Sequence, residues 1–152
     1  MDQTEKTPLA LEAFLPYTLS RAAELVSRRF ATIYKDHAGL TRPEWRTLAT
    51  LGQYGTLTAT LIGAHSSMHK TKVSRAVQSL EERKWLKRRT DEDDRRIEHL
   101  ELTREGERNY RKLAELARAF EAGLKELLGE KSFAELSRGL DAVEKQLGTD
   151  VF

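Results

Sequence analysis

Residues 71–107, TKVSRAVQSLEERKWLKRRTDEDDRRIEHLELTREGE, decide the fold of this chain. The first half has apolar residues at helical spacing among basic ones, and the second half opens with four consecutive acids at 91–94. Two arginines follow, and then apolar and polar residues alternate in IEHLEL, which is the period of a half-buried strand. The pattern predicts a basic helix that runs directly into a short, highly charged β-hairpin.

The helix that begins near Lys70 has two chemically different faces. At about 100° per residue, Val73, Ala76, Val77 and Leu80 fall within one narrow arc. The opposite arc holds polar groups that fit the DNA major groove: Thr71, Ser74, Arg75 and Gln78, with Lys70 and Lys72 at its margins. Arginine pairs with guanine, glutamine pairs with adenine, and lysine at the margins suits phosphates. Taken alone, such a pattern more commonly means a solvated helix face, so the hairpin that follows is what favours DNA.

Helix-start and helix-stop residues divide the rest of the chain. Thr41 followed by Glu44 is a capping box with Pro43 in the first turn, and Thr58 and Thr103 begin two further helices. Glycines end the helices: Gly39, then Gly52 and Gly55, then Gly129 and Gly148. The predicted elements are helices at 15–37, from 41, from 58, at 70–84, 104–128 and 131–147, and strands at 85–89 and 97–102; residues 9–14 form an extra turn or an arm. This order predicts a mainly α fold with a small β-hairpin wing (α+β), a winged helix-turn-helix with helical extensions at both ends.

Composition indicates one ordinary domain, predicted over 1–152, with 39% hydrophobic and 33% charged residues. No run approaches the roughly 18 apolar residues of a membrane span, and the acidic N-terminus is unlike a secretory signal, so we expect a cytoplasmic protein without membrane contact. The absence of cysteine excludes disulfides, thiolate zinc sites and thiol redox sensors. The net charge is only +2, but basic residues gather in the middle of the chain, which favours a nucleic-acid partner.

The ordered motifs of this region resemble the MarR family of winged-helix repressors. The matching segments are 72–75 (KVSR, recognition helix), 80–89 (the LExxGLIxR-like exit), 94–96 (the DxR wing), 102–106 (the closing LTxxG) and 40–51 (LTRPEWRTLATL, the second helix). The likeness covers about residues 15–147. Three features depart from the family pattern. Lys84, which precedes Trp85, stands where glycine is usual, so another C-cap is expected. Ser66 replaces an apolar residue, so Met68 is expected to pack the turn instead, and the DEDD wing tip lacks the common proline or glycine.

The resemblance implies how an acidic wing approaches DNA. Asp94 of the DxR motif would brace the hairpin by pairing with Arg96, while Arg95 would enter the minor groove, whose negative potential attracts arginine. This order of the two arginines is our interpretation, and the reverse order stays open. The remaining acids would face solvent and discourage loose binding. The alternative is a plain surface loop with ion pairs worth about 0–1 kcal/mol each.

The C-terminal helices exceed what a DNA-reading core needs. Their apolar stripes are Leu113, Leu116, Ala117, Phe120, Leu124 and Leu127, and then Phe133, Leu136, Leu140, Val143 and Leu147. By the resemblance, residues 15–37 and 103–147 build a two-fold homodimer, and residues 41–102 form the lobe that binds a pseudo-palindromic DNA operator. Packing within one chain is the alternative.

The family often binds a small molecule between the dimerisation helices and the DNA-binding lobe. Arginines near aromatic rings suit a small anionic or aromatic effector. The candidates are Tyr17, Arg21, Arg28, Arg29, Trp45 and Arg46. An ordinary exposed position is the commoner alternative for each arginine.

No catalytic, cofactor or metal motif stands out. The sequence has no Ser-His-Asp spacing, Gly-rich phosphate loop or HExxH, so we predict neither an enzyme nor a cofactor. No metal is expected at the histidines, which are His37, His65, His69 and His99. The sequence therefore predicts a dimeric, DNA-binding transcriptional repressor released by its ligand. The alternative is a winged helix that binds protein or RNA without a ligand response.

Overall fold

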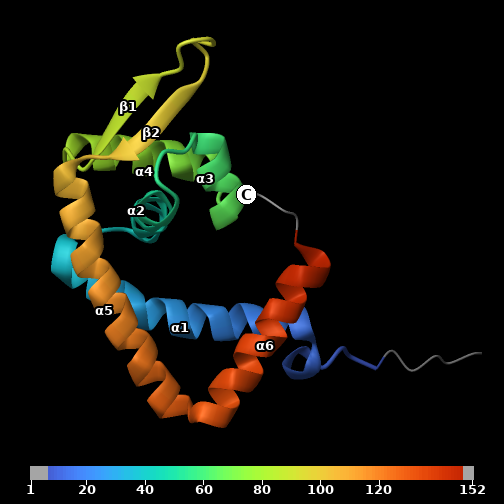
Figure 1. The fold of residues 1–152 in the computed structure, drawn as a ribbon. Helices are drawn as coiled ribbons and strands as arrows, with labels where there is room; N and C mark the ends of the chain where they lie inside the picture. Colours follow the sequence, from blue (N-terminus) through green and yellow to red (C-terminus); the bar gives the residue numbers. More distant parts are fainter. Residues whose placement is uncertain (1–6, 149–152) are drawn as a thin grey trace, which may run out of the picture.

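The computed structural model describes residues 7–148; the first six and last four residues of the predicted domain lie outside the described part. A short 3-10 turn, Leu11–Ala13, precedes the main elements. These are α1 Leu15–Ala38, α2 Arg42–Tyr54, α3 Ala59–Ser66, α4 Lys70–Glu82, β1 Leu86–Thr90, β2 Glu98–Leu102, α5 Arg104–Leu128 and α6 Glu130–Leu147 (Figure 1). The order confirms the predicted winged helix-turn-helix with helical extensions.

Helix α2 continues through Gly52, so the prediction that this glycine ends it is wrong. The helix runs to Tyr54 and ends at Gly55, whose φ of 80° requires the left-handed freedom of glycine. Gly52 serves packing instead, because a Cβ there would overlap the ring of Tyr110 on α5. The Thr41 side chain accepts from the backbone N–H of Glu44, as the capping box predicts.

The turn before the recognition helix is shorter than predicted. The sequence of residues 63–67 (GAHSS) predicts a tight connection, but residues 63–66 belong to α3 and only Ser67 makes the turn, at φ 52°. Met68 packs against the core, as expected. The Ser66 hydroxyl lies 3.3 Å from that of Thr50, so a polar contact replaces the apolar one that the family usually has here.

Helix α4 ends in a left-handed turn although it lacks the usual glycine. Lys84 adopts φ 64°, and the N–H of Trp85 donates to the carbonyl of Leu80 at 3.0 Å. This 6→1 bond is the Schellman arrangement normally made with glycine. The helix therefore uses the glycine-type cap with lysine in the place of glycine, and the expectation of another C-cap is wrong. Because lysine has a Cβ, this left-handed conformation is strained.

The two strands form an antiparallel hairpin in which Leu86 pairs with Leu102, Arg88 with Leu100 and Thr90 with Glu98. Each strand begins one residue later than predicted. The closing LTxxG motif has a structural reason here. The Thr103 side chain caps α5 by accepting from the N–H of Gly106, and a Cβ at Gly106 would overlap the carbonyl of Trp85.

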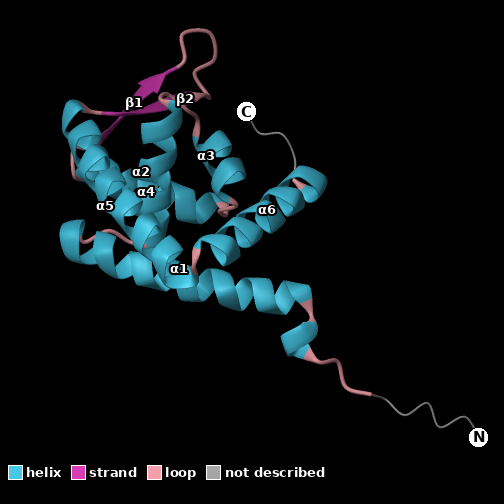
Figure 2. Ribbon diagram, turned by 60° about the horizontal axis from the view of Figure 1, so that its bottom comes forward, coloured by secondary structure: helices cyan, strands magenta, loops and turns pink. Residues whose placement is uncertain are grey.

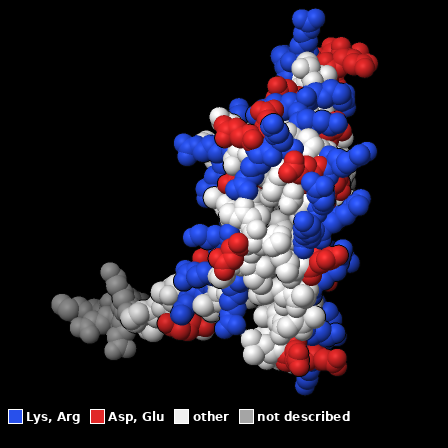
Figure 3. All heavy atoms as spheres, turned by 90° about the vertical axis from the view of Figure 1, so that its left-hand side faces the viewer, with Lys and Arg blue, Asp and Glu red and all other residues white. Residues whose placement is uncertain are grey.

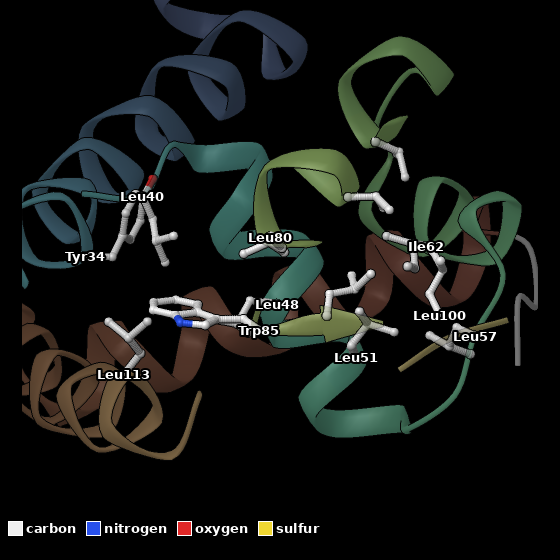
Figure 4. Close-up of a cluster of buried hydrophobic side chains, with 13 residues drawn as sticks. Tyr34, Leu40, Leu48, Leu51, Leu57, Ile62, Leu80, Trp85, Leu100 and Leu113 are labelled. Carbon is white, nitrogen blue, oxygen red and sulfur yellow. The ribbon is translucent and has the colours of Figure 1, made fainter. Parts of the chain in front are cut away.

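The core lies between α2, α3, α4, the strands and the start of α5 (Figure 4). It consists of Tyr34, Leu40, Leu48, Leu51, Leu57, Ile62, Val73, Val77, Leu80, Trp85, Leu86, Leu100 and Leu113. Helix α6 contributes no buried residue, and α5 contributes only Gly106 and Leu113. In Figure 1, α5 and α6 form a V whose closed end lies on the far side of α1 from the wing, and Figure 2 shows the wing and α1 at opposite ends of the winged core. Over residues 7–148, no helix has the length and apolarity that crossing a membrane requires.

Candidate nucleic-acid interface

Helix α4 presents a polar face and buries an apolar one. Val73, Ala76, Val77 and Leu80 are each at most 3% exposed. The opposite face is exposed and holds Lys70, Thr71, Lys72, Ser74, Arg75 and Gln78. His69 caps the helix, with its Nδ1 accepting from the N–H of Thr71. Thr71 and Ser74 on the exposed face are small, which lets this end of the helix approach a partner closely.

The two margins of α4 face different neighbours. Lys72 and Arg75 line a shallow hollow against the start of α2, next to Thr41 and Pro43. On the other side, Lys70 and Ser74 line a hollow of about 430 Å³ beneath the wing. Thr71 and Gln78 lie between these margins on the helical wheel. The structure thus brings the six predicted helix residues onto one surface that adjoins the wing.

The wing contains the expected Asp94–Arg96 pair. Arg96 Nε and Nη2 donate to the two carboxylate oxygens of Asp94, both at 3.0 Å, and the N–H of Arg96 donates to Oδ1 as well. Asp91 makes a second turn contact, because its Oδ2 accepts from the N–H groups of Asp93 and Asp94. The four-acid tip is therefore held by side-chain-to-backbone bonds in place of the usual proline or glycine.

Arg95 is exposed beside this braced turn. Within residues 7–148, no hydrogen bond or ion pair occupies its guanidinium, whereas the Arg96 guanidinium is paired with Asp94. Figure 3 shows basic and acidic side chains together at the wing tip, and mixed charge over the rest of that face. The contrast between the two arginines supports assigning groove insertion to Arg95.

Several basic residues counted from the sequence are already neutralised inside the hairpin. Arg88 donates to Glu81 and to Glu98 at 3.1 and 3.0 Å. Lys87 Nζ lies 3.4 Å from Glu101. These ion pairs offset the positive charge of Arg88 and Lys87. The exposed cations that remain for a polyanion include Lys70, Lys72 and Arg75 on α4 and Arg95 on the wing.

The wing should lose its turn structure in acid. The hydrogen bond from Arg96 lowers the pKa of Asp94 below its usual 3.8. The hydrogen bond from His99, followed by the two backbone N–H groups, lowers the pKa of Asp91 in the same direction. Because both folded pKa values are depressed, this stabilisation is present above pH 3.8 and is lost as the pH falls through the lowered values.

We expect amide signals of residues 91–97 to shift toward random-coil values below pH 3.8 in an NMR titration. The fluorescence of the two tryptophans, Trp85 in the core and Trp45 packed against it, reports global unfolding separately. An Asp94→Asn variant should show a weaker transition. The prediction is wrong if the amide signals of the wing keep their native chemical shifts down to pH 2.5 while the core stays folded. That pH is roughly one unit below the usual Asp pKa.

A second hollow, of about 270 Å³, lies between α1, α2 and α5. Its wall contains a ring cluster in which Phe30 lies 5.4 Å from Tyr34, 5.2 Å from Trp45 and 5.2 Å from Phe120, measured between centroids. Of the six predicted ligand residues, only Trp45 and Arg46 line it.

The other four predicted ligand residues lie elsewhere on α1. Arg21 stacks on Tyr17 at 5.8 Å from the ring centroid. Arg28 pairs with Glu24 and is 74% exposed, and Arg29 is exposed. Within one chain, these four residues therefore do not join the hollow.

Sequence reasoning missed Arg42, which also lines this hollow. Its Nη1 donates to Glu24 Oε2 at 3.0 Å and ties the start of α2 to α1. This hydrogen bond holds the pKa of Glu24 below its usual value. Arg42 and Trp45 are three residues apart on α2 and so share a helix face, which is the signal that could have identified the arginine.

Three of the four histidines take part in structural contacts. His99 Nε2 lies 2.7 Å from Asp91 Oδ1, His65 Nε2 lies 3.1 Å from the Tyr54 hydroxyl, and His69 caps α4. Among residues 7–148, no group of three or more His, Asp or Glu side chains has the arrangement of a metal site.

Comparison with known proteins gives three kinds of similarity. A family model described as the MarR family matches residues 38–97, from the end of α1 to the wing. YwoH of Bacillus subtilis (strain 168), named as an uncharacterized HTH-type transcriptional regulator, is 28% identical over 99 residues, which are 65% of this chain and 71% of YwoH.

Solved structures extend the similarity beyond the matched segment. The MarR family transcriptional regulator SPO1453 from Silicibacter pomeroyi DSS-3 matches with a TM-score of 0.81 and 26% identity, over 92% of this chain and 99% of that one. NadR in complex with 4-hydroxyphenylacetate matches with a TM-score of 0.72 and 23% identity, over 96% and 99% of the two chains, and this likeness concerns the fold alone. The agreement therefore includes the terminal helices as well as the winged core.

Proposed function

Because the chain belongs to the MarR family of winged helix-turn-helix transcriptional regulators, we propose that it is a homodimeric, sequence-specific repressor released by a small anionic or aromatic ligand. Binding DNA to regulate transcription is the activity of the family, whose members are regulators and not enzymes. The proposal adds the dimer, the sense of regulation, the ligand and the residues that act. We place its action in the cytoplasm, on a pseudo-palindromic operator.

The observation that carries the proposal is the exposed α4 face beside a braced wing. A helix whose apolar half is buried and whose other half offers hydroxyl, amide and guanidinium groups has the composition needed to read base edges. Arg75 and Gln78 supply the two groups that pair bidentately with guanine and adenine. Lys70 and Lys72 at the margins would contact phosphates, and Arg95 would enter the adjacent minor groove.

The dimer is proposed from apolar surface that one chain leaves uncovered. The exposed apolar side chains of α1 include Leu15 at 63% and Leu25 at 64%. Those of the α5–α6 arm include Leu127, Leu128, Leu136, Leu140 and Leu147, between 40% and 80%. Leu9, Leu11 and Phe14 extend the same surface toward the N-terminus at 65%, 42% and 43%. Apolar surface gathered on so few elements marks an interface, and a two-fold dimer would pair two α4 helices with a two-half-site operator.

The ligand is proposed for the hollow between α1, α2 and α5. Trp45 and the other rings offer an apolar wall for an aromatic group, and Arg46 offers a cation for a carboxylate, whereas Arg42 is already paired with Glu24. Glu121 also lines the hollow and disfavours a ligand with several negative charges. NadR, which shares the fold, is described in complex with 4-hydroxyphenylacetate, a phenolic carboxylate of the proposed class. A ligand here would touch both the proposed dimerisation layer and α2 of the DNA-binding lobe.

Titration of duplex DNA from the gene's own upstream region tests the proposed function. We expect preference over scrambled duplex of the same length by at least about 10³-fold, with affinity that falls steeply with salt. Addition of a phenolic carboxylate should release the operator, and Arg46→Ala should reduce that release while leaving binding without ligand near the wild-type value. Equal affinity for operator and scrambled DNA would reject sequence-specific binding and favour a protein- or RNA-binding winged helix.

Replacing Arg95 with alanine should lower operator affinity while leaving the base preference of α4 intact. The loss should be larger for operators with A·T-rich flanks, because their narrow minor grooves attract arginine most strongly. Binding is measured on operators that differ only in the flanks. Glu92→Gln is the matched wing control, and removing this exposed acid should instead raise affinity for scrambled DNA. A flank-independent loss for Arg95→Ala would show that Arg95 contacts phosphate only.

A further inference from the structure

Arg83, the residue after α4, reaches back to the end of α1. Its Nη1 donates to the carbonyl of Ala38 at 2.6 Å and its Nη2 donates to the carbonyl of Gly39 at 3.0 Å. Carbonyls at a helix C-terminus lack intrahelical partners and carry partial negative charge. A guanidinium satisfies two of them with charge-assisted hydrogen bonds. The C-terminal ends of α1 and α4 are thereby joined through one side chain.

The same guanidinium also contacts α2. Glu44, in the first turn of α2, is buried, and its Oε1 accepts from the Thr41 hydroxyl at 3.0 Å. Its Oε2 has no hydrogen-bond partner in the described part of the chain and lies 3.7 Å from Arg83 Nη2. Without Arg83, this carboxylate would remain buried with no cation within ion-pair distance among residues 7–148.

Trp85 holds the guanidinium from another side. Arg83 Cζ lies 5.2 Å from the centroid of the Trp85 ring, which is itself 8% exposed. The Trp85 carbonyl accepts from the N–H of Thr103, so the backbone beneath the ring is tied to the start of α5. A planar guanidinium can donate to two carbonyls and stack on a ring at once, which an ammonium group cannot do.

We propose that Arg83 is a positioning residue that fixes the direction of the recognition helix α4 relative to α1. The covalent connection between these helices passes through α2 and α3, whereas Arg83 joins their ends directly. If α1 belongs to the dimer layer, as proposed above, the Arg83 contact sets the separation of the two α4 helices and hence the half-site spacing that the dimer accepts. This last step rests on the proposed function; the α1–α4 contact does not.

Distance measurements test the α1–α4 step without DNA. The chain has no cysteine, so spin labels at Thr32→Cys on α1 and Gln78→Cys on α4 are specific. Pulsed electron spin resonance should give a narrow distance distribution in this labelled protein and a broader one when Arg83→Met is added. Arg83→Lys should be intermediate, because it keeps a cation near Glu44 but loses the paired hydrogen bonds. Lys35→Ala, which removes an exposed cation from the same end of α1, should leave the distribution narrow.

Operators with altered spacing test the consequence for DNA. Unlabelled wild type, Arg83→Met, Arg83→Lys and Lys35→Ala are compared on the operator, on versions with one or two base pairs inserted between half-sites, and on a single half-site. Arg83→Met should lower the affinity for the operator on the order of 10- to 100-fold, because it removes part of the affinity gained by joining two half-sites. Its affinity for the single half-site should fall by less than about twofold. Its affinities for operators of different spacing should differ less than those of the wild type.

The outcomes separate the two proposals. An unchanged distance distribution in a folded Arg83→Met protein would overturn the positioning role whether or not the protein binds DNA. If Arg83→Met loses the same affinity on the operator and on the half-site, Arg83 does not set the spacing and instead supports α4 locally or contacts DNA. Failure of wild type to prefer its operator would reject the proposed function, while the distance measurement would still decide the role of Arg83.

Discussion

Deletion of residues 130–152 should abolish the dimer and lower affinity for a two-half-site operator by about 100- to 10,000-fold, the gain that joining two binding units supplies. Helix α6 contributes no buried residue to its own chain. Its apolar stripe includes Leu136 at 44%, Leu140 at 41% and Leu147 at 80% exposure, which is costly unless a second chain covers it. The winged core lies apart from α6 and should survive the deletion (Figure 1).

Analytical ultracentrifugation measures the dimer, and duplex titration measures the affinity. The truncated chain is expected to be a monomer, or to aggregate through the uncovered end of α5, where Leu127 is 68% exposed. Aggregation would obscure the reading, so Leu140→Asp serves as a milder change within the intact chain. Arg138→Asp is its matched control, because Arg138 lies about 160° away from Leu140 on the helical wheel. A soluble truncated dimer with full affinity would show that the interface lies elsewhere.

Replacing Arg75 with alanine should cost about 1–3 kcal/mol per half-site on the cognate operator and relax base preference at the contacted position. For a dimer on two half-sites the total is about 2–6 kcal/mol if the two losses add. Arg75 is exposed on the same α4 face as Thr71, Ser74 and Gln78, which is the basis for assigning it to base edges. Its position beside Lys72, at the hollow against α2, makes the comparison between these two residues decisive.

Lys72→Ala should instead weaken all duplexes about equally and lower the salt slope by roughly one unit per lost contact, because it is assigned to phosphate. The experiment compares wild type and both variants on cognate and scrambled duplexes across a salt series. Lys131→Ala is a control that removes an exposed cation at the start of α6, at the opposite end of the molecule from α4 (Figure 1). If Arg75→Ala and Lys72→Ala lower the binding affinity by the same factor on every duplex, α4 does not read bases in the proposed orientation.

The candidate interface was largely predictable because it depends on local periodicity. A single helix of 3.6 residues per turn sets which α4 residues share a face, so Val73 and Leu80 could be assigned to the core and Thr71 and Gln78 to solvent before any fold was known. The Asp94–Arg96 pair was expected from the resemblance to the MarR family, and its two residues lie two positions apart in one tight turn. Side chains that meet within a few residues of one another need little tertiary information.

The candidate ligand site was predicted poorly because it depends on three helices. Tyr17, Arg21, Arg28 and Arg29 have suitable chemistry, but they lie on parts of α1 that do not line the hollow with Trp45. Arg42 was missed although it lines the same hollow. Composition shows that arginines and rings occur near one another in sequence, and it does not show which turn of α1 packs against α2.

The sequence by itself determined the order of elements, the two faces of α4, the capping threonines and the absence of thiol chemistry, because each follows from local spacing or composition. Only the tertiary structure decided the roles of Gly52, Lys84 and Arg83. Position 52, inside α2, needs a glycine because Tyr110, 58 residues away, packs where a Cβ would lie. Lys84 accepts a left-handed conformation because the chain must turn into β1 at that residue. Arg83 joins α4 to α1 through hydrogen bonds to residues 45 and 44 positions earlier. Contacts at such separations depend on how the helices pack, and no local pattern encodes that packing.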